Sequence, residues 1–137
     1  MNRIKKTFAI NTLNQAEKVL KFFINKKIKP IIYIRNYIIK GFGYDWIVNF
    51  KQLLESKFNK NFYIYADAGY DFGLCTILIN NKINYIKIKS NKNIMKKLQQ
   101  IAKKNKVLLN PNFNIVDLSN LKNLEKKLEI LTLDIKK

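Results

Sequence analysis

The stretch from Asn61 to Cys75, NFYIYADAGYDFGLC, runs from apolar residues into two aspartates and two glycines before it becomes apolar again. Asp67 and Asp71 could accept hydrogen bonds from a ligand hydroxyl or amine, or hold a magnesium ion through water. General acid catalysis is not expected, because a surplus of cations favours the charged form of a carboxylate. The same residues are also typical of a bend that leads from a strand into a capped helix.

A second glycine-containing stretch, KGFG, places Lys40 between the apolar residues before it and two glycines, Gly41 and Gly43. Backbone N–H groups and a lysine at the start of a helix could hold an anion, and Arg35 could join from the preceding strand. The stretch matches neither a P-loop nor a dinucleotide-binding fingerprint. A plain flexible loop is the other interpretation, and in the ligand-binding hypothesis this loop would cover the pocket.

Several reaction types are excluded by composition. The chain of 137 residues has no histidine and one cysteine, Cys75. A Ser-His-Asp triad, a Cys-His pair and a typical zinc site are therefore ruled out, and two carboxylates four residues apart do not define a metal site. Cys75 lies among apolar residues and is interpreted as a small buried side chain. The sequence predicts neither a cofactor nor a metal, and it does not define a reaction.

The elements that must position these residues alternate between strands and helices. Strands are expected at residues 6–10, 30–36, 61–68, 83–90 and 106–110, and helices at 12–26, 44–58, 70–81, 91–105 and 119–131. Residues 36–43 are expected to form a loop. This alternation predicts a single α/β domain over residues 1–137, with a mainly parallel sheet of four to five strands and helices on both faces. An open doubly wound sheet is preferred, and half of a TIM-like barrel is the alternative.

In a parallel sheet the carboxyl ends of the strands share one edge, where ligands bind. The polar residues and glycines that the sequence places at this edge are the candidate ligand-binding residues: Arg35, Lys40, Gly41, Gly43, Asp67, Gly69, Asp71, Gly73, Ser90 and Asn110. Asp45 and Asp71 also have an explanation as residues that stabilise helix starts.

The formal net charge of +18 arises from 27 basic and 9 acidic residues. Nearly all the basic residues are lysines, which occur on every expected element, and Lys, Asn and Ile are all abundant, as AT-rich codons would produce. The sequence thus permits a nucleic-acid partner but does not favour one. No apolar run is long enough to span a bilayer, and the single cysteine fits a cytoplasmic protein.

The order of motifs, from PIIYIRN through YADAGYDFGLCTIL to NIVDL, resembles a small alphaproteobacterial family of uncharacterised proteins with an Asp-Cys-Gly-Asp-x-x-Gly turn. Asp67, Gly69 and Gly73 match the first aspartate, the first glycine and the last glycine of that turn. Ala68 stands in place of the cysteine, so thiol chemistry is not expected here, and Asp71 is shifted by one position. The resemblance implies an α/β fold that is distantly similar to a piece of an aldolase-type barrel.

Three functions remain open at this point. The first is binding of a small anionic or hydroxylated metabolite at the carboxyl ends of the strands, lyase-like only by analogy. The second is a basic module that associates with nucleic acid or the ribosome. The third is an interaction subunit without chemistry, which could form a homo-oligomer through a sheet edge or a barrel-completing surface.

Overall fold

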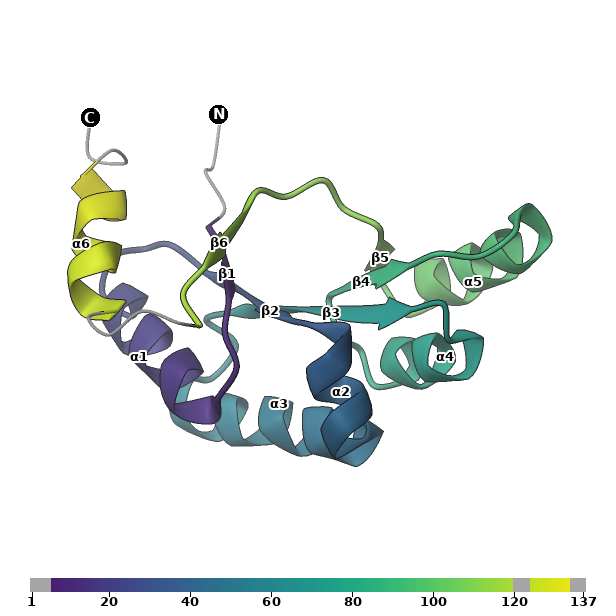
Figure 1. Cartoon of the computed structure of the whole chain (residues 1–137), viewed down its shortest axis with the longest axis horizontal. Helices are drawn as coiled ribbons and strands as arrows, with labels where there is room; N and C mark the ends of the chain where they lie inside the picture. Colours follow the sequence, from purple (N-terminus) through teal and green to yellow (C-terminus); the bar gives the residue numbers. More distant parts are fainter. Residues whose placement is uncertain (1–5, 120–123, 134–137) are drawn as a thin grey trace.

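Six parallel strands form one sheet in the computed structural model, which describes residues 6–119 and 124–133 (Figure 1). The strand order is β5-β4-β3-β2-β1-β6. The strands are β1 (Thr7–Ala9), β2 (Ile31–Ile34), β3 (Tyr63–Gly69), β4 (Tyr85–Ile88), β5 (Leu108–Leu109) and β6 (Ile115–Asp117). The predicted α/β class with a parallel sheet is confirmed, although the sheet has more strands than the four to five expected.

The helices begin mostly where the sequence predicted them. They are α1 (Leu13–Phe23), α2 (Asn36–Phe42), α3 (Tyr44–Phe58), α4 (Phe72–Asn80), α5 (Lys92–Lys104) and α6 (Leu124–Leu133). The side chains of Thr12, Asp71 and Asn91 each accept a hydrogen bond from a backbone N–H three residues later, which fixes the starts of α1, α4 and α5. None of the helices in the described ranges combines the length and apolar character that crossing a bilayer requires.

Two elements differ from the sequence-based prediction. Residues 36–42, expected as a loop, form α2, because Ile38 and Ile39 are buried against the core and their burial offsets the weak helix propensity of Gly41. Strand β6 was not predicted at all. It is only three residues long, and Ile115 is exposed, so no alternation of apolar and polar residues marks it.

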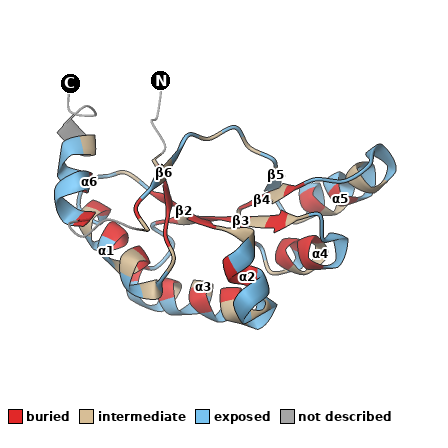
Figure 2. Ribbon diagram, in the orientation of Figure 1, coloured by how far each residue is buried: buried red, intermediate tan, exposed pale blue. Residues whose placement is uncertain are grey.

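All helices of the described chain lie on one face of the sheet. Strands β1 to β5 are neighbours in chain order, and right-handed connections between successive neighbours place α1 to α5 on the same side. Helix α6 packs against α1. Figure 1 shows α1, α2, α3 and α4 below the sheet, and Figure 2 shows buried residues on the sheet-facing sides of these helices. The expected helices on both faces are therefore not found, and the arrangement is that of the half-barrel alternative.

The opposite face of the sheet carries aromatic side chains instead of helices. Tyr33, Tyr65 and Tyr85 are buried there, and Phe113 packs edge-on against Tyr65 and Tyr85, with ring centroids 5.9 and 5.0 Å apart. Phe113 belongs to residues 110–114, which we call the strap and which connect β5 to β6 on this face (Figure 1). The strap thus covers the surface that would face the interior of a complete barrel.

The strap also requires the sheet to be curved. Six residue steps separate Leu109 from Ile115, and they can reach at most about 22 Å. In a flat sheet of six strands the two outer strands would lie about 24 Å apart, before any displacement along the strands is added. The outer strands β5 and β6 must therefore approach each other across the aromatic face, as in part of a barrel.

Thr7 provides a first testable prediction about stability. Its side chain is fully buried in β1, and its hydroxyl has no hydrogen-bond partner among the described residues. Because a buried unpaired hydroxyl is costly, we expect Thr7→Val, which has a similar shape, to raise the free energy of unfolding by about 1 kcal/mol. Urea denaturation measures the difference, and Thr7→Ser, which keeps the hydroxyl but loses a methyl group, should be less stable than the parent. A Thr7→Val protein that unfolds at lower urea would contradict the prediction.

Candidate functional site

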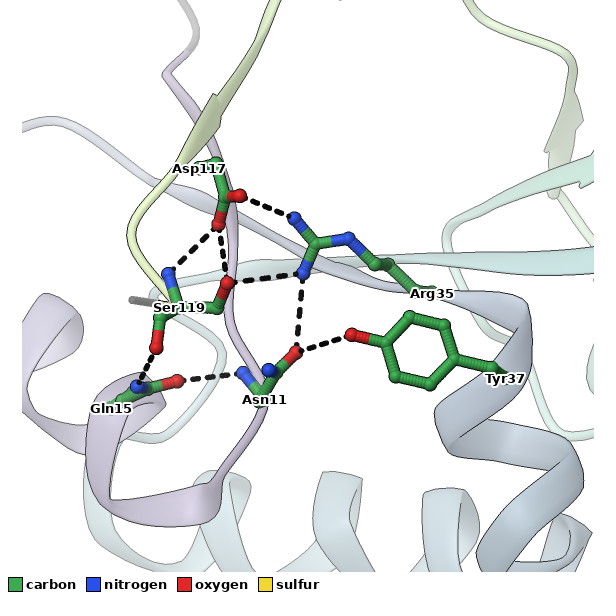
Figure 3. A network of polar contacts seen from close by, with 6 residues as sticks. All are labelled: Asn11, Gln15, Arg35, Tyr37, Asp117 and Ser119. Carbon is green, nitrogen blue, oxygen red and sulfur yellow. Dashed lines mark hydrogen bonds and ion pairs between the residues drawn. The ribbon is translucent and has the colours of Figure 1, made fainter. Parts of the chain in front are cut away.

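The carboxyl ends of the six strands meet at one edge, which we call the carboxyl edge. At this edge Arg35, which follows β2, forms an ion pair with Asp117 at the end of β6, with 2.9 Å between Nη2 and Oδ2 (Figure 3). Arg35 Nη1 also donates to Asn11 Oδ1 at 3.2 Å and to Ser119 Oγ at 3.4 Å. The guanidinium therefore reaches across β1 and links residues that follow three neighbouring strands.

Gln15, in the first turn of α1, completes this Arg35 network. Its side-chain oxygen accepts a hydrogen bond from the Asn11 backbone N–H at 2.7 Å, and its Nε2 donates to the Ser119 carbonyl at 2.8 Å. The Tyr37 hydroxyl donates to Asn11 Oδ1 at 3.3 Å. Figure 3 shows these side chains directed toward one another between β6, α1 and the start of α2. The network holds the loop after β1 against the residues after β6.

Asp117 stays ionised at neutral pH. Hydrogen bonds from the hydroxyl and the backbone N–H of Ser119, together with Arg35, lower the pKa of Asp117 to about 2 against the opposing effect of its slight burial. For Arg35, burial lowers the pKa, but the hydrogen bond and charge of Asp117 outweigh it and raise the pKa above its usual value. Arg35, predicted from sequence to meet an anionic ligand, thus already has an anionic partner within the chain.

Asp67 forms a second polar cluster beside the first. The Tyr33 hydroxyl donates to Asp67 Oδ2 at 3.2 Å, the Gly69 backbone N–H donates to Oδ1 at 2.8 Å, and Asn36 Nδ2 donates to the Asp67 carbonyl at 2.9 Å. A shift of register between Asp67 and Gly69 marks a bulge in β3, and Gly69 has a φ of +63°. Bulges at strand ends redirect side chains, and this one directs the Asp67 carboxylate back over Gly69.

Tyr33 connects the two clusters electrostatically. Burial and the negative charge of Asp67 raise the pKa of Tyr33, while the positive charge of Arg35 lowers it. Burial and Asp67 likewise raise the pKa of Tyr65. Tyr33 belongs to the apolar stretch that forms β2, where a packing role is expected. Its ring does pack on Tyr65, with centroids 4.9 Å apart, but its hydroxyl belongs to the polar edge.

Replacing Asp67 tests this coupling. We expect Asp67→Asn to lower the pKa of Tyr33, because the negative charge that disfavours tyrosinate is removed while the burial of the ring is kept. The ultraviolet absorbance of tyrosinate, followed as pH is raised, measures the change, and Tyr33→Phe identifies which part of the titration belongs to Tyr33. Asp71→Asn keeps a capping side chain on α4 and should leave the titration as in the parent protein. An unchanged Tyr33 titration in Asp67→Asn would show that the hydrogen bond does not form.

The glycine-containing stretch KGFG does not form the predicted cover loop. Lys40 and Gly41 lie in α2, and Lys40 is exposed. Gly43 separates α2 from α3 with a φ of +91°, a conformation that favours glycine. This correction follows from the burial of the α2 isoleucines described above, which makes a helix out of the expected loop.

The other sequence-predicted residues are distributed along the edge. Asp71 caps α4 by accepting from the Leu74 backbone N–H at 3.0 Å, and Gly73 lies inside that helix. Ser90 is exposed after β4, and Asn110, after β5, accepts from the Ile88 backbone N–H at 2.8 Å. The structure brings Arg35 and Asp67 to adjacent strands, whereas Ser90 and Asn110 follow β4 and β5 on the far side of β3.

Several residues of the two polar clusters were not among the candidates predicted from the sequence, including Asn11, Gln15, Tyr33, Tyr37, Asp117 and Ser119. Asp117 and Ser119 follow β6, which the sequence did not reveal. An Asx-type pattern was present, since Asp117 Oδ1 accepts from the Ser119 backbone N–H, but this pattern is common in turns and does not by itself indicate a site.

The carboxyl edge also gathers exposed aromatic side chains. Each aromatic residue among the exposed large apolar residues of the described chain belongs to the segments that follow β2 and β3: Tyr37, Phe42, Tyr44, Tyr70 and Phe72. Tyr70 is 78% exposed. Tyr37 bonds to Asn11, and Tyr70 and Phe72 follow Asp67 within five residues, so these three rings offer an apolar surface near the hydrogen-bonding groups.

A groove of about 400 Å³ lies elsewhere, between α1 and α6. It is lined by Asn14, Glu17, Lys18, Lys21, Phe22, Glu125 and Glu129. None of the sequence-predicted site residues borders it. In the described part of the chain, no three side chains of the types that bind metals come together.

Comparisons with known proteins agree with the fold. No protein-family model matches the chain, and no curated protein sequence does. Among solved structures, the chain is similar to a protein of Coccidioides immitis that is provisionally described as a fructose-1,6-biphosphate aldolase, with a TM-score of 0.60 and 10% sequence identity. The match covers 77% of this chain but only 39% of the other, so the chain spans well under half of that protein. This similarity shows the fold alone, and the resemblance to the alphaproteobacterial family stays a prediction.

Proposed function

We propose that this protein binds a small hydroxylated or anionic metabolite at the carboxyl edge of its sheet. One observation supports the proposal most strongly. Polar side chains from residues at or just after the carboxyl ends of β6, β1, β2 and β3 converge at this edge. In barrel-like and open parallel folds this edge is where ligands bind. The exposed aromatic residues of the same edge add an apolar surface beside the polar groups.

The charges at the edge favour hydroxyl groups over a strongly anionic ligand. Asp67 has carboxylate oxygens that accept hydrogen bonds, and the Tyr33 hydroxyl and Asn36 amide lie next to it. Arg35 is paired with Asp117, so a ligand carboxylate or phosphate would have to share the guanidinium with that side chain. A hydroxylated ligand instead meets both hydrogen-bond donors and hydrogen-bond acceptors, and its C–H groups can pack on the aromatic rings.

The proposal stops at binding and does not include the reaction of an aldolase. A lysine that forms a Schiff base is typically desolvated to make its amine nucleophilic. Lys40 and Lys89, near the carboxyl edge, are exposed. The sequence also lacks the histidines that hold a catalytic zinc ion. Lyase-like chemistry is thus an analogy from the fold, whereas ligand binding rests on the side chains present.

A ligand screen with matched variants tests the proposal. The purified protein is heated with sugars, sugar phosphates and hydroxy acids, and native mass spectrometry detects any small molecule that copurifies. A ligand should raise the melting temperature of the parent and of Glu125→Gln, an exposed control on α6, and should bind Asp67→Asn at least about tenfold more weakly. If no compound binds, or if Asp67→Asn binds as tightly as the control, the proposal is wrong.

A further inference from the structure

The edge of the sheet opposite the carboxyl edge has a different charge. Four connections that lead from a helix into the next strand, residues 24–30, 59–62, 81–84 and 105–107, lie together at this edge because the strands β2 to β5 all begin there. They contain six lysines and no acidic residue: Lys26, Lys27, Lys29, Lys60, Lys82 and Lys106. We call these residues the lysine edge. All six are exposed.

The carboxyl edge lacks this surplus of positive charge. There, the cations Arg35, Lys40 and Lys89 are balanced by Asp67, Asp71 and Asp117. In the sequence the lysines seemed evenly spread, because every helix and strand has one nearby. Because the strands are parallel, the connections that lead into strands lie at one edge and the connections that leave strands lie at the other. Among the connections between strands and helices, the surplus of positive charge therefore lies at one edge of the sheet.

Three lysines of this edge occupy backbone conformations that cost energy. Lys27, Lys82 and Lys106 have φ values of +57°, +61° and +59°, and each lies in the turn between a helix and the next strand. Glycine is the favoured residue in this left-handed conformation, and asparagine is next. Asn59, in the turn before β3, has a φ of +56° but a ψ of −138°, so it does not adopt the left-handed helical conformation. The other three turns each carry a lysine at a positive φ, where glycine or asparagine would fit better.

Codon bias does not explain these three lysines. Asparagine codons are as AT-rich as lysine codons, and asparagine would suit the left-handed conformation better. Lysines near a helix end do interact favourably with the helix dipole, but a lysine in the last helical turn achieves this without left-handed backbone strain. A charge that is kept in an unfavourable backbone conformation points to a function for the charge itself.

We propose that the lysine edge binds the phosphate backbone of double-stranded nucleic acid without sequence preference. The four neighbouring strand starts span about 14 Å, which corresponds to about four phosphates along one strand of a duplex. Exposed lysines act as flexible point charges that suit phosphates, whereas base recognition typically uses arginine. This surface is separate from the proposed ligand site at the opposite edge.

Two other anionic partners fit the surface less well. A membrane-binding surface combines basic residues with large apolar side chains that enter the bilayer. A surface for single-stranded nucleic acid combines them with aromatic rings on which bases stack. In the described chain, the exposed aromatic residues lie after β2 and β3 at the carboxyl edge, and Ile24 is the one exposed large apolar residue in the four lysine-bearing connections. One such side chain is fewer than a membrane-binding surface uses. A lysine surface without exposed rings is expected to contact the backbone of a duplex only.

A triple variant separates binding from folding. In Lys27→Asn/Lys82→Asn/Lys106→Asn each new residue suits the left-handed conformation, so the melting temperature should equal or exceed that of the parent. The control, Lys18→Gln/Lys97→Gln/Lys127→Gln, removes the same charge from exposed positions on α1, α5 and α6. Fluorescence anisotropy with a labelled short DNA duplex, titrated over a range of salt concentrations, measures binding.

The parent should show a slope of log K against log salt of about −4. In the triple asparagine variant the magnitude of this slope should fall by about three, and the affinity at low salt should be at least about tenfold weaker than that of the parent. The affinity of the control should stay within about threefold of the parent. Equal weakening in the control would show that net charge alone attracts DNA and would overturn the proposal. Binding of the parent to anionic vesicles but not to the duplex would overturn it as well.

A second variant keeps the proposal testable if the first is unstable. Lys26→Gln/Lys29→Gln/Lys60→Gln changes three exposed residues of the same edge that do not have a positive φ. It should weaken duplex binding to a similar degree. Unchanged binding in this variant would contradict the proposal regardless of the behaviour of the asparagine variant.

Discussion

Replacing Phe8 by alanine is expected to lower the free energy of unfolding by about 3–5 kcal/mol, because it removes a large ring from the centre of the core. Phe8 is fully buried in β1, which pairs with β2 on one side and β6 on the other. Its ring lies 5.5 Å from that of Phe23 on α1. The strand has only three residues, so few other contacts can replace those of the ring.

Chemical denaturation of the parent and the variant measures this loss. Phe8→Leu is the control, since it keeps most of the apolar volume and should cost less than half as much. Phe8→Ala should also disturb the carboxyl edge, because β1 leads directly to Asn11 and the Arg35 network. A Phe8→Ala protein that loses less than about 1 kcal/mol would mean that β1 does not form the centre of the core.

Gly69→Ala should destabilise the protein for two separate reasons. Gly69 has a φ of +63°, a conformation that costs residues with a Cβ atom about 1–2 kcal/mol. A Cβ atom there would also lie 3.1 Å from Asn36 Nδ2, which is closer than ordinary contacts. The Asn36 amide would have to move from its hydrogen bond to the Asp67 carbonyl. We therefore expect a loss of stability at the upper end of this range and weaker binding of any ligand that contacts Asp67.

A double-mutant cycle separates the two causes. In the background of Asn36→Ala the steric contact is absent, so Gly69→Ala should cost only the backbone contribution. Gly69→Asn is a further control, because asparagine tolerates the left-handed conformation better than alanine. Denaturation curves of the four proteins give the coupling energy. If Gly69→Ala costs the same in both backgrounds, the contact with Asn36 has no energetic role.

The regular elements could be predicted because their patterns are local. The apolar positions of residues 44–58 repeat at helical spacing, and α3 has these bounds. Asp71 was interpreted as a residue that stabilises a helix start, and it caps α4. Helix α2 was missed because its weak helix formers are stabilised by burial of Ile38 and Ile39, which no local pattern reveals. Strand β6 was missed because edge strands of three residues carry little periodicity.

The site could be predicted only in part for a similar reason. Parallel strands placed Arg35 and Asp67 at one edge, as the alternation of strands and helices indicated. The partner of Arg35 could not be predicted, because Asp117 becomes its neighbour only when β6 pairs with β1. The clustering of lysines could not be predicted either, because it depends on tertiary structure. The direction of every strand must be known before each connection can be assigned to one edge of the sheet.

The pairing of β1 with β6 has a consequence for the order of folding. Thr7 pairs with Ile115, so β1 leaves the ribosome before β6 and obtains this second neighbour only after all the residues between the two strands have been synthesised. Contacts between residues so distant in sequence slow folding, and an unpaired strand edge promotes aggregation. During translation the nascent chain therefore exposes one side of β1 and the tyrosines beneath the strap, and both become protected together when the last strand arrives.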